Sequence, residues 1–346
     1  MLANMFAGGL KNFRKQGTQN FINARRFYRR PSVEYIYFNG QKQGNSWNWG
    51  SFTQRQKRNI YIAGGVLGLV IVTHIEEAPV THRKRLMLTS DWVEDMVTES
   101  SYRQVISQYG RYVLPEQHPI TRKIRSIMTR LITAAHDHID PETGERINLF
   151  KALGKPDIPL DQWEIYVIDD VSMGSPSPNA FVIGGGKVFI FRSILPICKD
   201  DNGIATVLSH ELGHLLADHI GEKLTASPFF FTLNLFFFSI FGSSAPGDIF
   251  NMLLNNSYSR EMECEADYIG LMVQSRACFN PSNAPLLWKN MIEFEKRQGS
   301  RAPELLSTHP SSERRFQNLN EWMPRALSIY ENSECNITTQ FPFRLI

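Results

Sequence analysis

The chain has 346 residues, of which 42% are hydrophobic and 21% are charged. This length allows one large domain or two ordinary ones, and the composition excludes wholesale disorder, collagen and a disulfide-stapled miniprotein. The net charge is +3, but residues 1–59 hold eleven Lys or Arg and a single acid, Glu34, which leaves 26 basic and 33 acidic residues for the rest. Because the basic excess lies outside the folded part, no nucleic-acid partner is expected.

The N-terminal segment has the composition of a targeting sequence. Residues 1–33 contain seven basic residues, no acid, and apolar residues spaced for one side of a helix. We expect a mitochondrial transit peptide over 1–33, with a disordered basic tail as the alternative. Residues 34–59 would then be a linker.

Residues 60–75 form an apolar run with Arg55, Lys57 and Arg58 before it and Glu76 and Glu77 after it. At about 1.5 Å per residue the run covers roughly 24 Å, less than the usual hydrocarbon thickness of about 30 Å. The sharp charge change still favours a transmembrane helix over a buried core helix. The basic side would keep 34–59 in the matrix and place residues 76–346 in the intermembrane space.

A second apolar segment, residues 228–241, is rich in Phe. It is too short to span a bilayer, which leaves a core helix, a re-entrant piece or a segment at the lipid surface. Because Phe would lie on every side of a helix, we expect membrane contact.

The remaining pattern predicts an α+β fold, mostly helical with a small antiparallel sheet. Helical spacing runs through 120–135 and 204–220, and further helices are expected near 258–275, 283–298 and 311–330. A strand is expected at 163–168, and two more, 180–183 and 187–191, flank Gly184, Gly185 and Gly186 as a hairpin.

The helix at 204–220 carries His210-Glu211-Leu212-Gly213-His214. Residues four apart share a helix face, so both imidazoles can reach one ion while Glu211 points at its water. Zinc suits neutral imidazole ligands and a site with one open position.

A third ligand must come from elsewhere, and His219 is read as a helix-surface or capping residue. Glu263 and Asp267, four apart, would share a face of the next helix. Glu263 could bind the metal while Asp267 accepts the spare N–H of a ligating histidine. Glu261 and Glu265 are expected at the surface, and Cys264 is expected to be structural.

These motifs resemble a known family. His210-Glu211-x-x-His214, Ser259-Arg260-x-x-Glu263-x-x-Ala266-Asp267 and Ser307-Thr308-His309-Pro310, with Arg315 six residues after the histidine, are similar to the gluzincin clan of bacterial HtpX and type I CAAX prenyl proteases. Within that clan, residues 76–335 resemble the mitochondrial inner-membrane zinc peptidases whose activity overlaps with the m-AAA protease, in their fungal form. The prenyl proteases have many membrane helices, so prenyl-peptide processing is not expected.

The resemblance implies a zinc metalloendopeptidase with one Zn²⁺ per chain. His210, His214 and Glu263 would be ligands, Glu211 the general base and then acid, and Asp267 a partner of a ligating histidine. His309 would donate to the substrate carbonyl, and Arg315 would hold acidic groups beside the site. The strand Asn179, Ala180, Phe181 and Val182 would pair with an extended substrate.

The same resemblance implies inner-membrane protein substrates, quality control and stress response, and contact with the lipid bilayer. A homo-oligomer and a catalytically inactive scaffold of the same fold are left open. A secretory enzyme is a third alternative, because Asn255 and Asn336 begin glycosylation sequons. The four cysteines show no C-x-x-C spacing. In the intermembrane space Cys278 and Cys335 could form a disulfide, and four buried free thiols are the alternative.

Overall fold

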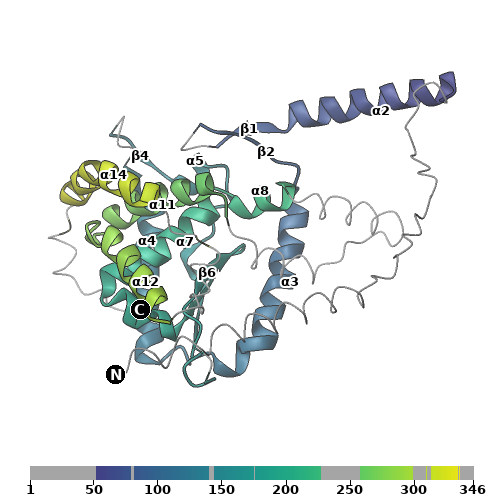
Figure 1. Cartoon of the computed structure of the whole chain (residues 1–346). Helices are drawn as coiled ribbons and strands as arrows, with labels where there is room; N and C mark the ends of the chain where they lie inside the picture. The colour runs from purple at the N-terminus through teal and green to yellow at the C-terminus, as the bar shows by residue number, and fades with distance from the viewer. Residues whose placement is uncertain are drawn as a thin grey trace, which may run out of the picture. The chain divides into compact units, whose positions relative to one another are not determined.

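A computed structural model of the chain describes residues 52–78, 82–139, 144–174, 176–226, 258–298, 309, 313–333 and 335. The expected transit peptide at 1–33, most of the linker at 34–59 and the Phe-rich segment at 228–241 therefore lie outside the described residues. The chain divides into two units at Gly65. Most elements, from β1 onward, belong to the second unit (Figure 1).

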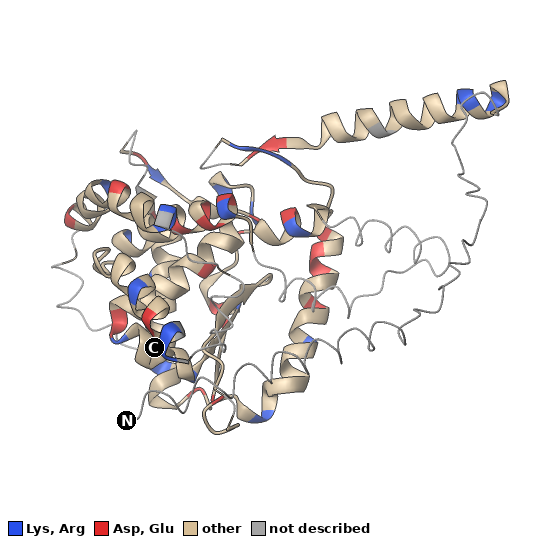
Figure 2. Cartoon of the chain, viewed as in Figure 1, with Lys and Arg blue, Asp and Glu red and all other residues tan. Residues whose placement is uncertain are grey.

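Helix α2 (Gln54–Thr73) contains residues 60–73 of the apolar run expected at 60–75. The helix begins six residues earlier than that run, and Ile75 already belongs to strand β1. Figure 2 shows basic residues at the start of α2 and none along the rest, and apolar side chains such as Val66, Leu69 and Val72 are exposed. Among the described helices, none combines the length and the hydropathy that a membrane crossing requires.

After the end of α2, the second unit continues with a hairpin and two long helices. Strands β1 (Ile75–Glu77) and β2 (Lys84–Leu86) pair antiparallel. Helices α3 (Asp91–Tyr109) and α4 (Pro119–His136) follow, and α4 starts with Pro at its first position, where the missing N–H costs nothing. The short elements that follow are β3 (His138–Ile139), β4 (Arg146–Ile147), α5 (Leu149–Ala152) and η3 (Leu160–Gln162).

The main sheet has the strand order β5-β7-β6, formed by β5 (Glu164–Ile168), β6 (Ala180–Ile183) and β7 (Lys187–Phe191). The β6–β7 hairpin is present, with Ala180 opposite Ile190. The expectation of a purely antiparallel sheet is wrong, because β7 pairs parallel with β5. The segment after β5 leads to β6 at the far edge of the sheet. Strand β7 then returns between β6 and β5 and runs in the same direction as β5.

Helix α7 (Asp201–Leu216) lies at the centre of the second unit, packed against α4, α11, α12 and β6 (Figure 1). The carboxylate of Asp200 caps it by accepting a hydrogen bond from the backbone N–H of Gly203 at 2.9 Å. The predicted single helix over 204–220 is interrupted, because the backbone of Asp218 takes a left-handed conformation (φ 58°). Helix α8 (His219–Ala226) starts directly after this residue.

The C-terminal half supplies three helices that match the predicted ranges closely. They are α11 (Arg260–Arg276), α12 (Asn283–Gln298) and α14 (Glu313–Asn332). Two glycines let α11 lie against α7. A Cβ added to Gly213 would lie 2.7 Å from the carbonyl oxygen of Ala266, and one on Gly270 would lie 2.8 Å from that of Ser209. This close approach brings the polar residues of the two helices together.

Candidate metal and catalytic site

Four side chains meet in the interior, three from two helices and the fourth from a loop. His210 and His214 come from α7, Glu263 from α11, and His309 follows from the chain before α14. One ligand atom from each lies within 4.8 Å of the others, and all four residues are buried. The structure therefore brings together the three predicted ligands and adds His309 to them.

The spacing of these atoms fits a tetrahedral cation. The Nε2 atoms of His210 and His214 are 3.1 Å apart, and they lie 3.5 and 3.4 Å from the carboxylate oxygens of Glu263. Ligands about 2.0–2.1 Å from a tetrahedral zinc ion lie about 3.3 Å from each other. Nitrogen and carboxylate donors are also the set that zinc prefers. The residues present thus fit a zinc ion.

The charges at the site also favour a bound cation. Burial alone would raise the pKa of Glu263, but His309 and Arg315 hold it well below its usual range, so the side chain is a carboxylate. Burial lowers the pKa of His210, but hydrogen bonds from its ring to Asp267 and Glu263 outweigh this effect and raise it to about 9. The acceptors around His210 therefore favour positive charge, and a bound cation would replace the proton.

Glu211 lies next to the cluster on α7. Burial raises the pKa of its carboxyl group, and Nε2 of His309 is 3.5 Å from Oε1. Among the described residues, Oε1 is buried without a hydrogen-bond partner. A buried acceptor of this kind beside a cation site is available to accept a hydrogen bond from water or substrate.

Asp267 and Arg315 support the cluster from behind. Asp267 Oδ1 is 3.0 Å from His210 Nδ1, and Arg315 contacts both Asp267 and, at 2.5 Å, Glu263 Oε2. The ring of Trp288 contacts both ends of this arrangement: its centroid is 5.4 Å from that of the His210 ring and 4.1 Å from Cζ of the Arg315 guanidinium. The contact between Asp267 and the outward nitrogen of a cluster histidine is the one expected from the Glu263–Asp267 spacing.

Two residues read from the sequence as surface groups are buried, so those expectations are wrong. His219 and Glu265 are both 0% exposed, and His219 Nδ1 lies 2.8 Å from His214 Nδ1. The left-handed backbone of Asp218 interrupts the helix, so His219 does not continue the face of α7 and its side chain is buried. Continuous helical spacing through 220 gave no sign of this turn.

Tyr258 is a further site residue that the sequence reading missed. Its ring stacks on His214 with centroids 4.0 Å apart, and the Nζ of Lys223 lies 3.9 Å from the Tyr258 ring centroid. Burial lowers the pKa of Lys223 to about 8. Tyr258 precedes the cap residue Ser259 of α11, and no spacing relates it to His214.

The predicted substrate strand and disulfide have clear positions. β6 is at the edge of the main sheet, and within the described ranges no strand pairs with its outer side. Asn179 is buried, and its side-chain oxygen accepts a hydrogen bond from the N–H of Ala180 at 2.9 Å. Cys278 and Cys335 are joined by a disulfide with Cα atoms 5.3 Å apart, whereas Cys198 and Cys264 are free.

Comparison with known proteins agrees with this site. The peptidase family M48 model matches residues 147–323. The mitochondrial metalloendopeptidase OMA1 of Saccharomyces cerevisiae is 37% identical over 353 residues, covering 97% of this chain and 96% of that protein. The Schizosaccharomyces pombe protein of the same name is 35% identical over 87% of each chain. The human metalloendopeptidase OMA1 is 27% identical, covering 82% of this chain and 53% of that protein.

These matches confirm the resemblance drawn from the motifs and set aside the inactive scaffold. The chain is a metalloendopeptidase that belongs to peptidase family M48 and, within it, to the mitochondrial metalloendopeptidase OMA1 family.

Proposed function

We propose that the chain is a zinc endopeptidase of the mitochondrial inner membrane that cleaves inner-membrane proteins during quality control and stress. The convergence of His210 Nε2, His214 Nε2 and the Glu263 carboxylate carries this proposal, because these three donors match a catalytic zinc site. The mitochondrial location is supported by the names of the two yeast relatives.

Glu211 is the general base in this proposal. A bound zinc ion would polarise the scissile carbonyl and lower the pKa of a water molecule, so that a hydroxide nucleophile would be available near neutral pH. Glu211 Oε1, which lacks a hydrogen bond among the described residues, accepts the proton of the attacking water and passes it to the leaving amine. No covalent acyl-enzyme is required.

His309 acts on the substrate rather than on the ion. Its Nδ1 is 2.9 Å from Glu263 Oε1 and 3.3 Å from His210 Nε2, so it lies at the fourth corner of the cluster. A catalytic zinc site needs one corner for water and the carbonyl. We therefore assign Nε2 of His309, which lies beside Glu211, to donating a hydrogen bond to the substrate carbonyl oxygen in the transition state.

The outer edge of β6 is the proposed binding strand. The N–H of Phe191 donates to the carbonyl oxygen of Asn179 at 2.9 Å, so in this antiparallel ladder Phe181 also faces β7 with its backbone groups. The backbone groups of Ala180 and Val182 then point away from β7. The Ala180 N–H already donates to Asn179 Oδ1, so an extended substrate would pair with the Ala180 carbonyl and with the N–H and carbonyl of Val182. Such pairing would favour unfolded or loop segments.

The membrane association is proposed from charge and hydropathy. Residues 60–75 are apolar, with Arg55, Lys57 and Arg58 before them and Glu76 after them. This asymmetry supports an anchor with residues 76–346 in the intermembrane space. Alkali extraction of mitochondria that carry Val66→Glu or wild type tests it, because only the variant should be released.

The decisive experiment measures zinc content and cleavage together. Glu211→Gln should keep one zinc per chain and lose cleavage of a candidate inner-membrane protein, while Glu263→Gln should lose both. Glu261→Gln, an exposed residue of α11, is the matched control and should behave like wild type. Cleavage by Glu211→Gln, or normal zinc content in Glu263→Gln, would refute the assignment.

The strand assignment has a separate test. Val182→Pro removes an amide that points outward and leaves the β7 ladder intact. It should raise KM for a protein substrate without changing zinc content. Val182→Ala keeps the amide N–H and should leave KM unchanged.

A further inference from the structure

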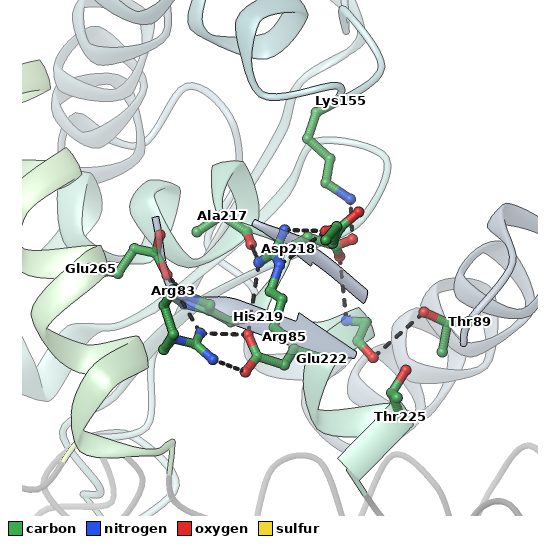
Figure 3. Close-up of polar contacts among 12 residues, drawn as sticks. Arg83, Arg85, Thr89, Lys155, Ala217, Asp218, His219, Glu222, Thr225 and Glu265 are labelled. Carbon is green, nitrogen blue, oxygen red and sulfur yellow. Dashed lines mark hydrogen bonds and ion pairs between the residues drawn. The ribbon is translucent and has the colours of Figure 1, made fainter. Parts of the chain in front are cut away.

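A chain of buried and partly buried polar side chains lies behind His214, on the side of the ring away from the cluster. His219 Nδ1 is 2.8 Å from His214 Nδ1, and His219 Nε2 is 3.2 Å from Glu265 Oε2. Arg83 then joins Glu265, at 3.6 Å, to Glu222, which it contacts with two bonds of 2.5 and 2.7 Å. Figure 3 shows the Arg83 guanidinium between these two carboxylates.

Metal binding at His214 Nε2 would fix every proton along this chain. The ligating nitrogen must present a lone pair, so the ring proton of neutral His214 resides on Nδ1. His219 Nδ1 then has to accept that proton's hydrogen bond, which places the proton of His219 on Nε2. Nε2 donates it to the carboxylate of Glu265. Each donor therefore faces an acceptor, and Arg83 compensates the buried charge of Glu265.

The other cluster histidine is held in a parallel way. His210 Nδ1 faces the Asp267 carboxylate, which is paired with Arg315. Both outward nitrogens thus connect to a carboxylate and an arginine, directly for His210 and through an imidazole for His214. Glu265 and Asp267 both come from α11, two residues apart. Arg83 comes from the β1–β2 hairpin, just before β2.

We propose that His219 is a positioning residue that holds the ring and tautomer of His214, and that Glu265 and Arg83 hold His219 in turn. This inference rests on the proposed zinc site. Partners of this kind commonly contribute tenfold to a hundredfold to metal affinity. His219 does not touch the substrate, so its effect is on the metal and not on the chemistry directly.

The test measures the zinc dissociation constant of the full-length protein by competition with a chelator, together with the unfolding temperature of the zinc-free protein. His219→Leu removes the acceptor and should weaken zinc binding about 10- to 100-fold. His219→Asn places a carbonyl oxygen close to the position of Nδ1 and should restore most of that loss. His138→Leu, at a buried histidine of β3 outside the cluster, should change only the unfolding temperature.

The outcomes separate the two proposals. If the wild-type protein binds no zinc, the proposed function itself fails. If wild type binds zinc and His219→Leu binds it equally well, or if His219→Asn is as weak as His219→Leu, the positioning role is wrong. An equal loss of affinity in His138→Leu would also overturn it, because the effect would then reflect general damage to the fold.

Discussion

Asp267 and Arg315 form a buried bidentate ion pair, with Nε 2.7 Å from Oδ2 and the terminal Nη2 2.8 Å from Oδ1. Burial would raise the pKa of Asp267, but the Arg315 guanidinium and the His210 ring lower it. The carboxylate is therefore charged and faces the outward nitrogen of His210. The pair links α14 to the cluster, since Arg315 belongs to that helix and also contacts Glu263.

We predict that Asp267→Ala weakens zinc binding about 10- to 100-fold, because His210 loses the acceptor that orients it. The variant should also lose stability, by up to about 3–5 kcal/mol, since Arg315 loses its bidentate partner and keeps only Glu263 as a buried counter-charge. Chelator competition and urea unfolding measure the two effects. Glu261→Ala, on the exposed side of α11, should change neither. Wild-type zinc affinity in Asp267→Ala would contradict the role given to the carboxylate.

We predict that Gly270→Ala disturbs the site without altering a polar residue. The added methyl group would lie 2.9 Å from the backbone nitrogen of His210 and 2.8 Å from the oxygen of Ser209, so α11 must move away from α7. Overpacking of this kind costs about 1–3 kcal/mol. The displacement should also lower zinc affinity, because Glu263 moves with α11. Gly64→Ala is the control, since nothing lies within 4 Å of its added Cβ. Equal unfolding temperatures for the two variants would disprove the close helix contact.

The residues that meet at the cluster were largely predictable from local spacing. His210 and His214, and likewise Glu263 and Asp267, are four apart on single helices, and a helix fixes which side chains share a face. The polar contacts of His219, Glu265 and Tyr258 were not predictable in this way. They depend on the left-handed backbone of Asp218, which interrupts the helix, and on packing between distant segments.

The elements of the fold likewise divide into those that local sequence predicts and those that it does not. Helix α4 has a broad apolar face and was predicted almost to the residue, whereas α3 was not predicted at all. Only Val97, Ser101 and Val105 of α3 are buried, a narrow stripe that includes a polar residue, so its sequence lacks a clear helical period. The direction of β5 relative to β7 depends on a crossover and is not encoded in the strand itself.

We predict that the Cys278–Cys335 disulfide stabilises the protein substantially. The two cysteines are 57 residues apart and lie just after α11 and α14, so the bond ties the ends of two helices that carry site residues. The chain-entropy model gives about 4 kcal/mol for a loop of this length. Cys335→Ser should lower the free energy of unfolding by this order, while Cys264→Ser, at a free cysteine, should have a much smaller effect. Mass spectrometry of the unreduced protein must show the linked peptides, and two free thiols at these positions would contradict the prediction.

We predict that Asp169 makes stability depend on acid pH through the loop before β6. Its carboxylate accepts hydrogen bonds from Ser172 and pairs with Arg192 at 3.0 Å, which ties the end of β5 to the residue after β7. Hydrogen bonding from Ser172, followed by Arg192, outweighs burial and lowers the pKa of Asp169 below its ordinary value. Because the unfolded chain binds this proton more readily, the stabilisation is complete above about pH 4 and is lost as the pH falls toward the lowered pKa of the folded state.

Asp169→Asn isolates this contribution from that of the buried acids. The difference in free energy of unfolding between wild type and Asp169→Asn should be largest near pH 6 and should shrink as the pH falls below the ordinary Asp pKa of about 3.9 toward the lowered pKa of the folded state. Urea unfolding at several pH values measures it. Asp161→Asn, at an exposed position in η3, should stay within about 0.5 kcal/mol of wild type at pH 6. A difference that grows as the pH falls would mean that the pKa of Asp169 is raised in the folded protein, and the Ser172–Asp169–Arg192 contacts could not then be what holds the loop beside β6.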